Sequence, residues 1–471
     1  MGIFSKKINT FDDTAASLCT APGGAISIIR ITGSGALDVA EKVWKGKSSL
    51  RKKENCRKVL LGKTIAGDEP CIAFYMKAPH SYTGDDTVEL QCHGGSIAPG
   101  RLLKAVLDAG ARQAEEGEFT RRAFLNGKLD LSQAEAVADL IGAKSNAAAD
   151  LALSQLSGML RNKIHFCTEK LFHVIAEIES RMDFPEEDLS WQSTEELLDE
   201  LSVIREKIEK LLATRQRGTV LREGVKLVIA GKPNSGKSSL LNTLLGYERA
   251  IVTDIAGTTR DTLEEMASFR NIPVRLSDTA GVRENTDDTI EKMGIERSRE
   301  TIRQAEVLFW VADLTDPQTL EDPFFSLEEL PENTSLILVW NKTDLLVDKE
   351  TEKAKGEKGF TEFRDGRKVP YVCISAKEDE GIESLLDVFQ EEVLAGKEFS
   401  SGESAISLRH EKELEKALQA LIQAQEVLQM EEWELAASSL RNASDFLGCI
   451  TGETASADIL DEIFSRFCIG K

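Results

Sequence analysis

Residues 231–238 could hold a chain of phosphates. They read GKPNSGKS, the pattern G-x-x-x-x-G-K-S, and they lie between an apolar run and a helical run. In that setting the glycines let backbone N–H groups wrap phosphates at a helix N-terminus. Lys237 would then neutralise the β- and γ-phosphates, and the Ser238 hydroxyl would bind Mg²⁺. The predicted phosphate cradle comprises Asn234, Ser235, Gly236, Lys237, Ser238 and Ser239.

Two downstream motifs could complete the metal and phosphate contacts. The segment Asp278-Thr279-Ala280-Gly281 follows a short apolar run, so Asp278 can hold Mg²⁺ through water and the Gly281 N–H can contact the γ-phosphate. Between the cradle and this segment, Thr258-Thr259 offers a hydroxyl group to the same Mg²⁺. These residues predict a nucleoside triphosphate that is bound together with Mg²⁺.

Two more motifs predict that the base is guanine. Asn341-Lys342-Thr343-Asp344 follows an apolar run, and the Asp344 carboxylate can accept hydrogen bonds from the guanine N1 and N2 groups, which adenine cannot match. Ser375-Ala376-Lys377 follows another apolar run and would hold the guanine O6. Each motif alone is weak, but all of them in this order predict a GTP-binding domain of the Ras-like type.

Hydrolysis of the nucleotide is a separate question, because Val282 follows Gly281. Many Ras-like proteins place a glutamine there to orient the attacking water, and valine cannot do so. Hydrolysis should therefore be slow without a partner, or other groups should take over this role. Asn234 is a candidate ligand for a monovalent cation, whose charge would stand where an arginine finger otherwise acts.

These motifs need a parallel sheet to position them, and the sequence predicts one. Apolar runs alternate with helical segments from residue 225 to about residue 390, which indicates βαβ units. The predicted strands cover residues 225–230, 274–276, 307–312, 336–340 and 369–374. The charged stretch 349–368 is expected to be a solvated insertion.

Helical patterns flank this domain on both sides. They fill residues 120–217, where one helix is expected to end at Phe184 and the next to cover 194–217, and they return from residue 405. We favour an α/β domain inserted into a helical domain, because both flanks carry apolar helical stripes to bury. A separate C-terminal bundle is the alternative.

The first 120 residues or so predict a mixed α and β domain. Residues 25–31 and 71–76 look like buried strands, and residues 97–109 look like a helix that ends at Gly110. The fold class of the whole chain is therefore expected to be multidomain, with an α+β domain, a helical domain and an inserted α/β domain.

The chain has 471 residues, a formal net charge of -22 and eight cysteines. Bulk attraction cannot hold a phosphodiester backbone on so acidic a chain, so contact with nucleic acid would need a local basic patch or a partner. No two cysteines form a C-x-x-C pair and no secretory signal precedes them, which predicts a reducing, cytoplasmic setting. No apolar run approaches the roughly 18 residues that span a bilayer, so no membrane is expected.

Seven segments give the chain a resemblance to the MnmE (TrmE) family of tRNA-modification GTPases over nearly its full length. The segments are residues 13–33, 80–95, 117–141, 182–188, 253–261 (TDIAGTTRD), 291–297 (EKMGIER) and 467–471 (FCIGK). The terminal CIGK is highly specific for the family. One departure lies at residues 22–25 (PGGA), a loop that is one residue shorter than in the family and lacks its arginine.

The resemblance implies four parts of the chain and a joint activity with a partner. Residues 1–120 would bind a one-carbon tetrahydrofolate (5-formyl- or methylene-tetrahydrofolate) and form a homodimer. Residues 121–217 and 396–471 would form the helical domain, and 218–395 the inserted G domain. With an MnmG-type flavoprotein that carries FAD, in a heterotetramer, GTP hydrolysis in the presence of K⁺ would drive modification of carbon 5 of the wobble uridine of certain tRNAs to an aminomethyl or carboxymethylaminomethyl group.

The resemblance also implies roles for individual residues. In the loop that covers Thr253, Asp254, Ile255, Ala256, Gly257, Thr258 and Thr259, the residues Thr253, Ile255 and Thr258 would bind K⁺ together with Asn234, and Thr259 would bind Mg²⁺ together with Ser238. The folate contacts would be Arg30, Glu89, Lys128 and Lys471. Glu291 would position the attacking water, and Cys468 would serve the modification but not GTP hydrolysis.

Other interpretations stay open at this point. Glu291 could make a surface i,i+4 ion pair, Cys468 could be a packed thiol, and Arg30 could be an edge charge on a strand. A ribosome-assembly GTPase is a rival function, which would predict a basic RNA-binding domain beside the G domain. A folate-dependent one-carbon transferase that needs no flavoprotein is another, with GTP in a regulatory role.

Overall fold

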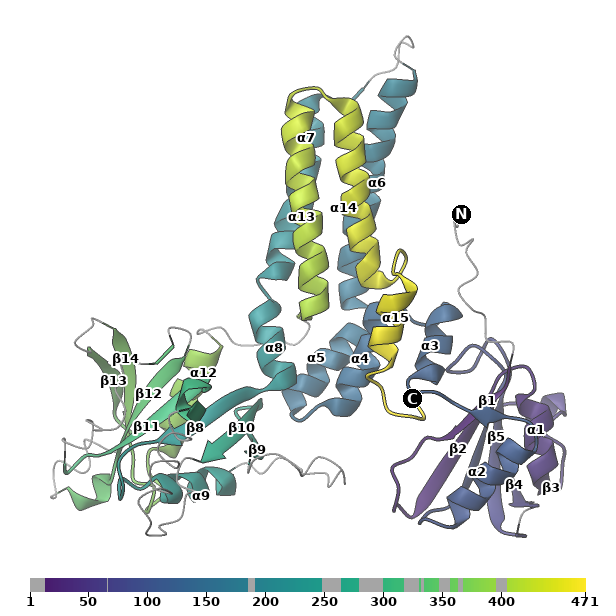
Figure 1. The fold of residues 1–471 in the computed structure, drawn as a ribbon, viewed down its shortest axis with the longest axis horizontal. Coiled ribbons are helices and arrows are strands. Elements are labelled where there is room, and N and C mark those ends of the chain that lie inside the picture. The colour runs from purple at the N-terminus through teal and green to yellow at the C-terminus, as the bar shows by residue number, and fades with distance from the viewer. Residues whose placement is uncertain are drawn as a thin grey trace. The chain divides into compact units, whose positions relative to one another are not determined.

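The computed structural model describes ten stretches of the chain. They are residues 13–65, 67–184, 191–247, 264–278, 300–316, 330–331, 334–346, 356–362, 367–394 and 405–471. The chain divides into two compact units (Figure 1). The first contains Met1–Ile141, Gln155–Leu212 and Arg409–Lys471, and the second contains Gly142–Ser154 and Ala213–Leu408.

The N-terminal part of the first unit is built on a seven-stranded sheet. Its strands are β1 (Ala15–Leu18), β2 (Ile26–Thr32), β3 (Trp44–Gly46), β4 (Val59–Thr64), β5 (Pro70–Met76), β6 (Thr87–His93) and β7 (Arg112–Gln113). They are arranged in the order β3-β4-β5-β6-β2-β1-β7. Only the pair of β1 and β7 is parallel, and the other neighbouring pairs are antiparallel.

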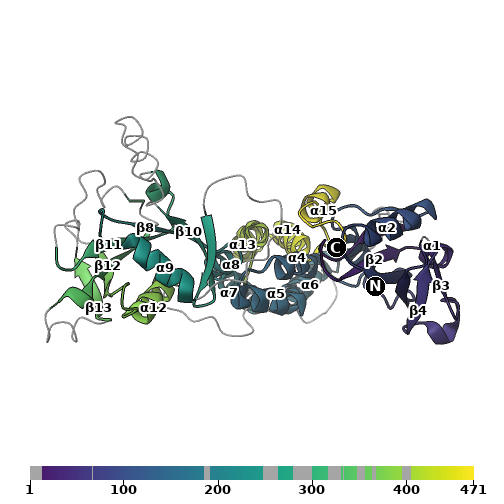
Figure 2. The same cartoon turned by 90° about the horizontal axis from the view of Figure 1, so that it is seen from below.

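Helices α1 (Ala36–Val43) and α2 (Ala98–Asp108) cover one face of this sheet (Figure 2). Strand β2 alternates as a half-buried strand should, with Ile29 and Ile31 buried under the helices and Arg30 directed to the other face. Val39 of α1 and Val106 of α2 belong to the same core. Each such fully buried side chain contributes about 1.5–3 kcal/mol, so this face holds the helices in place.

The rest of the first unit is helical. Its helices are α3 (Glu118–Leu125), α4 (Leu131–Gly142), α6 (Met159–Asp183), α7 (Thr194–Leu212), α13 (Leu408–Gln429), α14 (Trp433–Thr451) and α15 (Ala457–Phe464). The four long helices α6, α7, α13 and α14 lie side by side as a bundle (Figure 1). Within the described residues, no helix is both long enough and apolar enough to cross a bilayer.

Apolar positions at helical spacing hold this bundle together. Leu171 and Ile178 of α6 and Leu414, Leu421 and Leu428 of α13 have no exposed surface. Helices from both sides of the G domain in the sequence therefore share one core, which neither pair could bury alone. The predicted insertion of the G domain into a helical domain is confirmed, and a separate C-terminal bundle is excluded.

A buried charged cluster ties α4 to the start of α13. Glu135 accepts hydrogen bonds from Arg409 Nε at Oε1 (2.7 Å) and from Arg409 Nη2 at Oε2 (3.0 Å), and His410 Nε2 lies 2.7 Å from the same Oε2. Burial alone would raise the pKa of the Glu135 carboxyl, but His410 and Arg409 outweigh it and hold the pKa well below its usual range. The first helix after the inserted domain is thus fixed to α4, which lies well before that domain in the sequence.

The second unit contains another seven-stranded sheet. Its strands are β8 (Val225–Ala230), β9 (Glu264–Phe269), β10 (Ile272–Asp278), β11 (Val307–Asp313), β12 (Ser335–Asn341), β13 (Lys358–Glu362) and β14 (Lys368–Cys373). The order is β13-β14-β12-β11-β8-β10-β9, with five parallel strands in the centre and antiparallel β13 and β9 at the edges. The predicted parallel sheet is confirmed.

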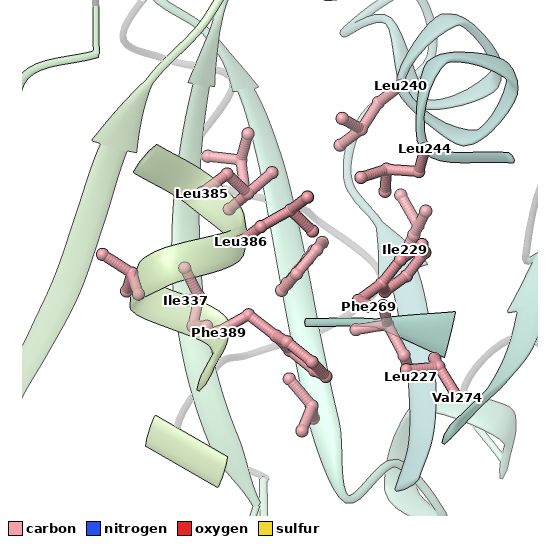
Figure 3. Close-up of a cluster of buried hydrophobic side chains, with 14 of the residues drawn as sticks. Leu227, Ile229, Leu240, Leu244, Phe269, Val274, Ile337, Leu385, Leu386 and Phe389 are labelled. Atoms are coloured by element: carbon pink, nitrogen blue, oxygen red, sulfur yellow. The ribbon is translucent and has the colours of Figure 1, made fainter. Parts of the chain in front are cut away.

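Helices α9 (Lys237–Tyr247) and α12 (Ile382–Val393) pack on one face of this sheet. Figure 3 shows Leu240 and Leu244 of α9 and Leu385, Leu386 and Phe389 of α12 around the same apolar core. Phe389 meets Phe269 and Phe309 edge to face, with ring centroids 6.0 and 6.1 Å apart. This core fixes α9, the helix at whose N-terminus the predicted phosphate cradle lies.

Two sequence predictions need correction. The helix expected over residues 194–217 is two helices, because α7 ends at Leu212 and α8 (Arg215–Glu223) follows in the second unit. The stretch 349–368 is not merely a solvated insertion, since β13 extends the sheet as an edge strand beside β14. The stretch has too few apolar residues to be predicted as a strand, because an edge strand with an exposed face needs few buried side chains.

The second unit also contains all but the last two residues of helix α5 (Asn146–Leu156), which precedes the long helices in the sequence. Leu151 of α5, Leu221 of α8 and Ala405 form one apolar cluster. Arg222 donates hydrogen bonds to the carbonyls of Ala405 and Ile406 at 2.9 and 3.0 Å. The two connections of the inserted domain therefore lie together.

Candidate nucleotide and C-terminal sites

The glycine-rich loop follows β8 and leads into α9, as the motif requires. Gly231 has φ 143° and Gly236 has φ 96°, a backbone conformation that favours glycine. A Cβ on Gly236 would lie 2.1 Å from Asn341 Nδ2, and one on Gly231 would lie 2.1 Å from the Val311 carbonyl oxygen. Asn234, at φ 63°, has the left-handed conformation that asparagine tolerates best among larger residues. The backbone of the loop therefore lies so close to its neighbours at Gly231 and Gly236 that no larger residue fits there.

Several groups of the loop are available for a ligand. The side chains of Asn234, Ser238 and Ser239 are exposed. Ser235 is buried, and its Oγ has no hydrogen-bond partner among the described residues. Lys237 Nζ donates to the Lys232 carbonyl at 2.7 Å, so the ammonium group is held at the loop. An unpaired buried hydroxyl and glycine-lined backbone at a helix N-terminus fit the phosphates of a nucleotide.

The residues of the two predicted guanine motifs lie side by side. Ser375 Oγ donates to Asp344 Oδ1 at 2.7 Å, which holds the carboxylate in place. Asn341 is buried, donates from Nδ2 to the Ser235 carbonyl at 2.9 Å, and accepts from the Ala376 N–H at 3.0 Å. Asn341 thus joins the phosphate loop to both guanine motifs.

Asp313 is a residue of this site that the motifs did not reveal. It ends β11 beside Asn341 in the sheet, and its Oδ2 accepts a hydrogen bond from Lys342 Nζ at 2.6 Å. Burial tends to raise the pKa of Asp313, but the hydrogen bonds from Lys342 and Thr315 lower it below the usual value. One feature of the sequence could have revealed Asp313: it is an acidic residue at the carboxyl end of an apolar strand, and ligands of parallel sheets bind at these ends.

The remaining nucleotide residues are only partly described. The backbone of Asp278 pairs with Ile229 of β8, so this strand end lies next to the phosphate loop. Lys377 is exposed beside Ala376. Thr253, Asp254, Ile255, Ala256, Gly257, Thr258, Thr259, Thr279, Ala280, Gly281 and Glu291 lie outside the described residues.

A second group of predicted residues lies on the open face of the N-terminal sheet. Arg30 donates from Nε and Nη2 to Glu89 Oε1 at 2.9 and 2.8 Å, and both side chains are mostly buried. The Arg30 guanidinium lies 5.3 Å from the ring centroids of Tyr82 and Phe119. Burial raises the pKa of the Cys19 thiol, and the opposite charges of Arg30 and Glu89 also act on this pKa.

The C-terminal segment is held against this part of the molecule. The Phe119 N–H donates to the Lys471 carbonyl oxygen at 3.0 Å, and Ile469 forms an antiparallel bridge with Glu116. Gly470, at φ 98°, lies so close to β1 that a Cβ would be 2.2 Å from the Leu18 carbonyl oxygen. Cys468 is exposed and unpaired as a thiol. The structure thus brings Lys471 to Arg30 and Glu89, which lie more than 380 residues earlier.

Lys128 and the shortened loop of residues 22–25 have no described contact with the pair of Arg30 and Glu89. Lys128 Nζ donates to the Pro79 carbonyl at 3.2 Å, in the loop that also carries Tyr82, and no described contact joins it to Arg30. The loop of residues 22–25 lies at the far end of the β2–β6 pair, where the Gly94 and Gly95 N–H groups donate to Ala25 and Gly24. Its missing arginine therefore leaves the pairing of Arg30 with Glu89 in place.

A buried ion network, which the sequence reasoning missed, positions α3 beside the C-terminal segment. Arg122 and Glu118 are each 1% exposed, and Arg122 donates from Nη2 to Glu118 at 2.7 Å and to Asp13 at 2.6 Å. Arg112 donates twice more to Glu118, at 2.7 and 2.8 Å. Phe119 lies in the same helix α3, next to Glu118, and its N–H donates the hydrogen bond to the Lys471 carbonyl oxygen.

The fold and the first site define a P-loop protein with a guanine-recognition loop, the class of GTP-binding proteins. Comparison with known families narrows this class. A family model described as "MnmE helical domain" matches residues 131–468, and one described as "GTP-binding protein TrmE N-terminus" matches residues 14–128. The chain belongs to the MnmE family of tRNA modification GTPases.

Relatives named "tRNA modification GTPase MnmE" match almost end to end. The one from Clostridioides difficile is 41% identical over 467 residues, covering 98% of this chain and 99% of the relative. The one from Aquifex aeolicus is 43% identical over 449 residues, covering 95% and 97%. The one from Natranaerobius thermophilus is 39% identical over 471 residues, covering 98% and 100%. This similarity disfavours a ribosome-assembly GTPase.

Proposed function

We propose that this protein binds and hydrolyses GTP in order to modify tRNA. The observation that carries the proposal is the hydrogen-bonded junction of the phosphate loop with the guanine motifs through Asn341. A carboxylate at Asp344 fixed by Ser375 is suited to select guanine over adenine. In this proposal residues 1–120, 121–217 with 396–471, and 218–395 act as the N-terminal, helical and G domains.

The G domain would use Mg²⁺ and K⁺. Ser238, exposed at the start of α9, would hold Mg²⁺ with Thr259, while Asp278 ends the neighbouring strand. Asn234 would bind K⁺ with backbone and side-chain oxygens of residues 253–258. These hard oxygen ligands suit both cations. Glu291 would position the attacking water in place of the glutamine that Val282 replaces.

The N-terminal site would bind the folate. Glu89 Oε2 has no hydrogen-bond partner among the described residues, since both bonds from Arg30 go to Oε1. A carboxylate held in this way can accept from the adjacent N–H groups of a pterin ring, and the rings of Tyr82 and Phe119 nearby suit an aromatic ligand. Lys471 and Lys128 would bind the folate carboxylates. A bound folate would supply a one-carbon unit near Cys468.

Two protein partners belong to the proposal. The open face of the N-terminal sheet exposes Val59 by 66% and Leu61 by 72%, and such apolar surface fits the proposed homodimer. An MnmG-type FAD protein would carry out the redox chemistry in a heterotetramer, and the wobble uridine of certain tRNAs would be the substrate. The cytoplasm is the setting in which these partners and K⁺ occur together.

We expect GTP turnover to be at least about tenfold faster in K⁺ than in Na⁺, because a cation at Asn234 would stabilise the negative charge that develops on the phosphates. The Asn234→Ala variant should turn over slowly in both salts while it still binds GTP. Steady-state phosphate release at equal ionic strength measures this difference. Equal rates in the two salts for the unchanged protein would remove the role of the cation.

Loss of the gene should leave the wobble uridines of the affected tRNAs without their modification, which mass spectrometry of digested tRNA can measure. A copy with Cys468→Ser should restore GTP turnover but not the modification, because the exposed thiol lies beside the C-terminal contacts and not in the G domain. Cys449→Ser is the matched control and should restore both. Unchanged tRNA in the deletion strain would disprove the proposed function.

A further inference from the structure

One segment of this acidic chain is strongly basic. Residues 42–63 contain nine of the 58 lysines and arginines but only one of the 80 acidic residues. The cations are Lys42, Lys45, Lys47, Arg51, Lys52, Lys53, Arg57, Lys58 and Lys63. We call this set the basic edge. The rest of the chain is therefore even more acidic than its net charge of -22 indicates.

The basic edge lies at one side of the N-terminal sheet. Lys42 lies in the last turn of α1, and the other eight cations lie in β3, β4 and the connection between them, which includes a short 3-10 helix over Lys53–Asn55. Strand β3 is the outermost strand of the sheet (Figure 2). All nine side chains are exposed. Lys45 and Lys63 are directly opposite each other in the register of β3 and β4. Like charges in such a pair destabilise a sheet.

Most of these cations have no ion-pair partner in the part of the chain that the structure describes. Arg51 pairs with Asp38 and Glu41, Lys63 pairs with Asp68, and Lys52 lies 4.0 Å from Glu54. Four lysines have no such partner. Among the described residues, no carboxylate oxygen lies within 4.0 Å of the Nζ atom of Lys45, Lys47, Lys53 or Lys58. The basic edge therefore presents several free ammonium groups on one border of the sheet.

Protection of an edge strand explains only part of this pattern. Lysines on an outer strand prevent pairing with another sheet, and Lys45 on β3 would serve that purpose. Lys47, Lys52, Lys53 and Lys58 lie outside both strands, where no unpaired strand edge needs protection. Their shared sign points instead to a polyanion that binds there.

We propose that the basic edge binds the phosphate backbone of the RNA substrate. The identity of this RNA as a tRNA rests on the proposed function. Trp44, the single aromatic residue of the segment, is buried, so the surface offers charge without stacking and should contact phosphates regardless of sequence. The acidic remainder of the chain repels RNA elsewhere, and this contrast would orient the bound molecule.

The position of the basic edge agrees with this role. The C-terminal segment with Cys468 lies against β1, five strands away from β3 in the same sheet. At about 4.8 Å between strands the two sites are roughly 24 Å apart. RNA that is held at the edge by its backbone could therefore extend to the C-terminal site.

The test compares two fourfold variants of the full-length protein. The first carries Lys47→Gln, Lys52→Gln, Lys53→Gln and Lys58→Gln. The second removes four exposed cations of the helical bundle with Arg205→Gln, Lys210→Gln, Lys412→Gln and Arg441→Gln, so both lose the same charge. The probe is a fluorescently labelled, unmodified tRNA transcript, and anisotropy is measured at several salt concentrations.

The first variant should bind the transcript at least about tenfold more weakly than the unchanged protein. Its plot of log K against log salt should be less steep by roughly 3, since each lost phosphate contact removes about 0.7–0.9. The second variant should bind like the unchanged protein. Both should retain their melting temperature, because exposed substitutions usually change stability by less than about 0.5 kcal/mol.

Three results would overturn the proposal. They are an unchanged protein that does not bind the transcript at low salt, two variants with equal affinity for it, and a first variant that loses affinity only for vesicles of phosphatidylserine and phosphatidylcholine. The last result would assign the edge to a membrane surface. GTP binding, measured on the same samples, tests the proposed function separately, because no residue of the basic edge belongs to the nucleotide site.

Discussion

Replacing Asp344 with asparagine is expected to abolish GTP binding and to create a preference for xanthosine triphosphate. The carboxylate can accept from guanine N1–H and from the amino group at C2, and Ser375 Oγ holds it at 2.7 Å. Asparagine keeps the shape of the aspartate side chain, but its NH₂ group would face the amino group at C2 of guanine, so that two donors would meet. Sites built around a specific polar group reject the mismatched ligand by about 10⁴-fold or more. Xanthine carries an oxygen at C2, which the asparagine N–H can match.

Titration with fluorescent GTP and with xanthosine triphosphate measures both effects. Ser375→Ala is the matched control, because it removes the hydrogen bond that holds the carboxylate but keeps the carboxylate itself. It should weaken GTP binding by roughly 1.5–3 kcal/mol and create no affinity for xanthine. If Asp344→Asn bound GTP as well as the unchanged protein does, the guanine site would lie elsewhere.

The largest effect on stability is expected from Arg122→Met. Methionine keeps much of the side-chain volume but leaves the Glu118 carboxylate, which is 1% exposed, with Arg112 as its remaining cationic partner. Removing one partner of a buried ion pair costs about 3–5 kcal/mol. Because Glu118 and Phe119 are adjacent in α3, the C-terminal segment at Lys471 should also become less ordered. Denaturant unfolding and hydrogen exchange at the C-terminus measure the two consequences.

The same network predicts how stability depends on pH. Burial would raise the pKa of Glu118, but the hydrogen bonds from Arg112, from the Glu115 N–H and from Arg122 hold this pKa below its usual range. A lowered folded-state pKa contributes stability above the unfolded-state pKa, and this contribution is lost as the pH falls through the folded-state value. In Arg122→Met the pKa of Glu118 should rise, so acid unfolding should begin at higher pH.

The double variant Glu118→Gln with Arg122→Met separates the charge from the packing. It leaves no buried carboxylate without its partner, so it should regain part of the stability that Arg122→Met loses. Arg121→Met, in the same helix and paired with the exposed Asp461, is the control and should cost less than about 1 kcal/mol. Equal losses for Arg121→Met and Arg122→Met would show that the buried network does not stabilise α3.

Contiguous motifs made much of the nucleotide site predictable. A phosphate loop needs glycines at fixed spacing between a strand and a helix, so Gly231, Gly236 and Lys237 could be read directly from the sequence. Asp344 and Ser375 were predictable for the same reason, because each follows its own apolar strand. Parallel strands carry these residues to the same edge of the sheet, as the contact between Asp344 and Ser375 confirms. Asp313 belongs to no motif, and it reaches the nucleotide site only because it lies at the end of β11, beside Asn341 of β12.

The class of fold, the motifs and the family resemblance could be inferred from the order of the amino acids, because they depend on residue types at short, fixed spacing. Tertiary structure alone decided which distant residues meet. Arg122 binds Asp13, which lies 109 residues away in the chain, and Arg409 binds Glu135, which lies 274 residues away. It also decided that Lys471 lies beside Phe119. Such contacts depend on how whole elements pack, and no local pattern of charge or hydrophobicity specifies the partner of a given side chain.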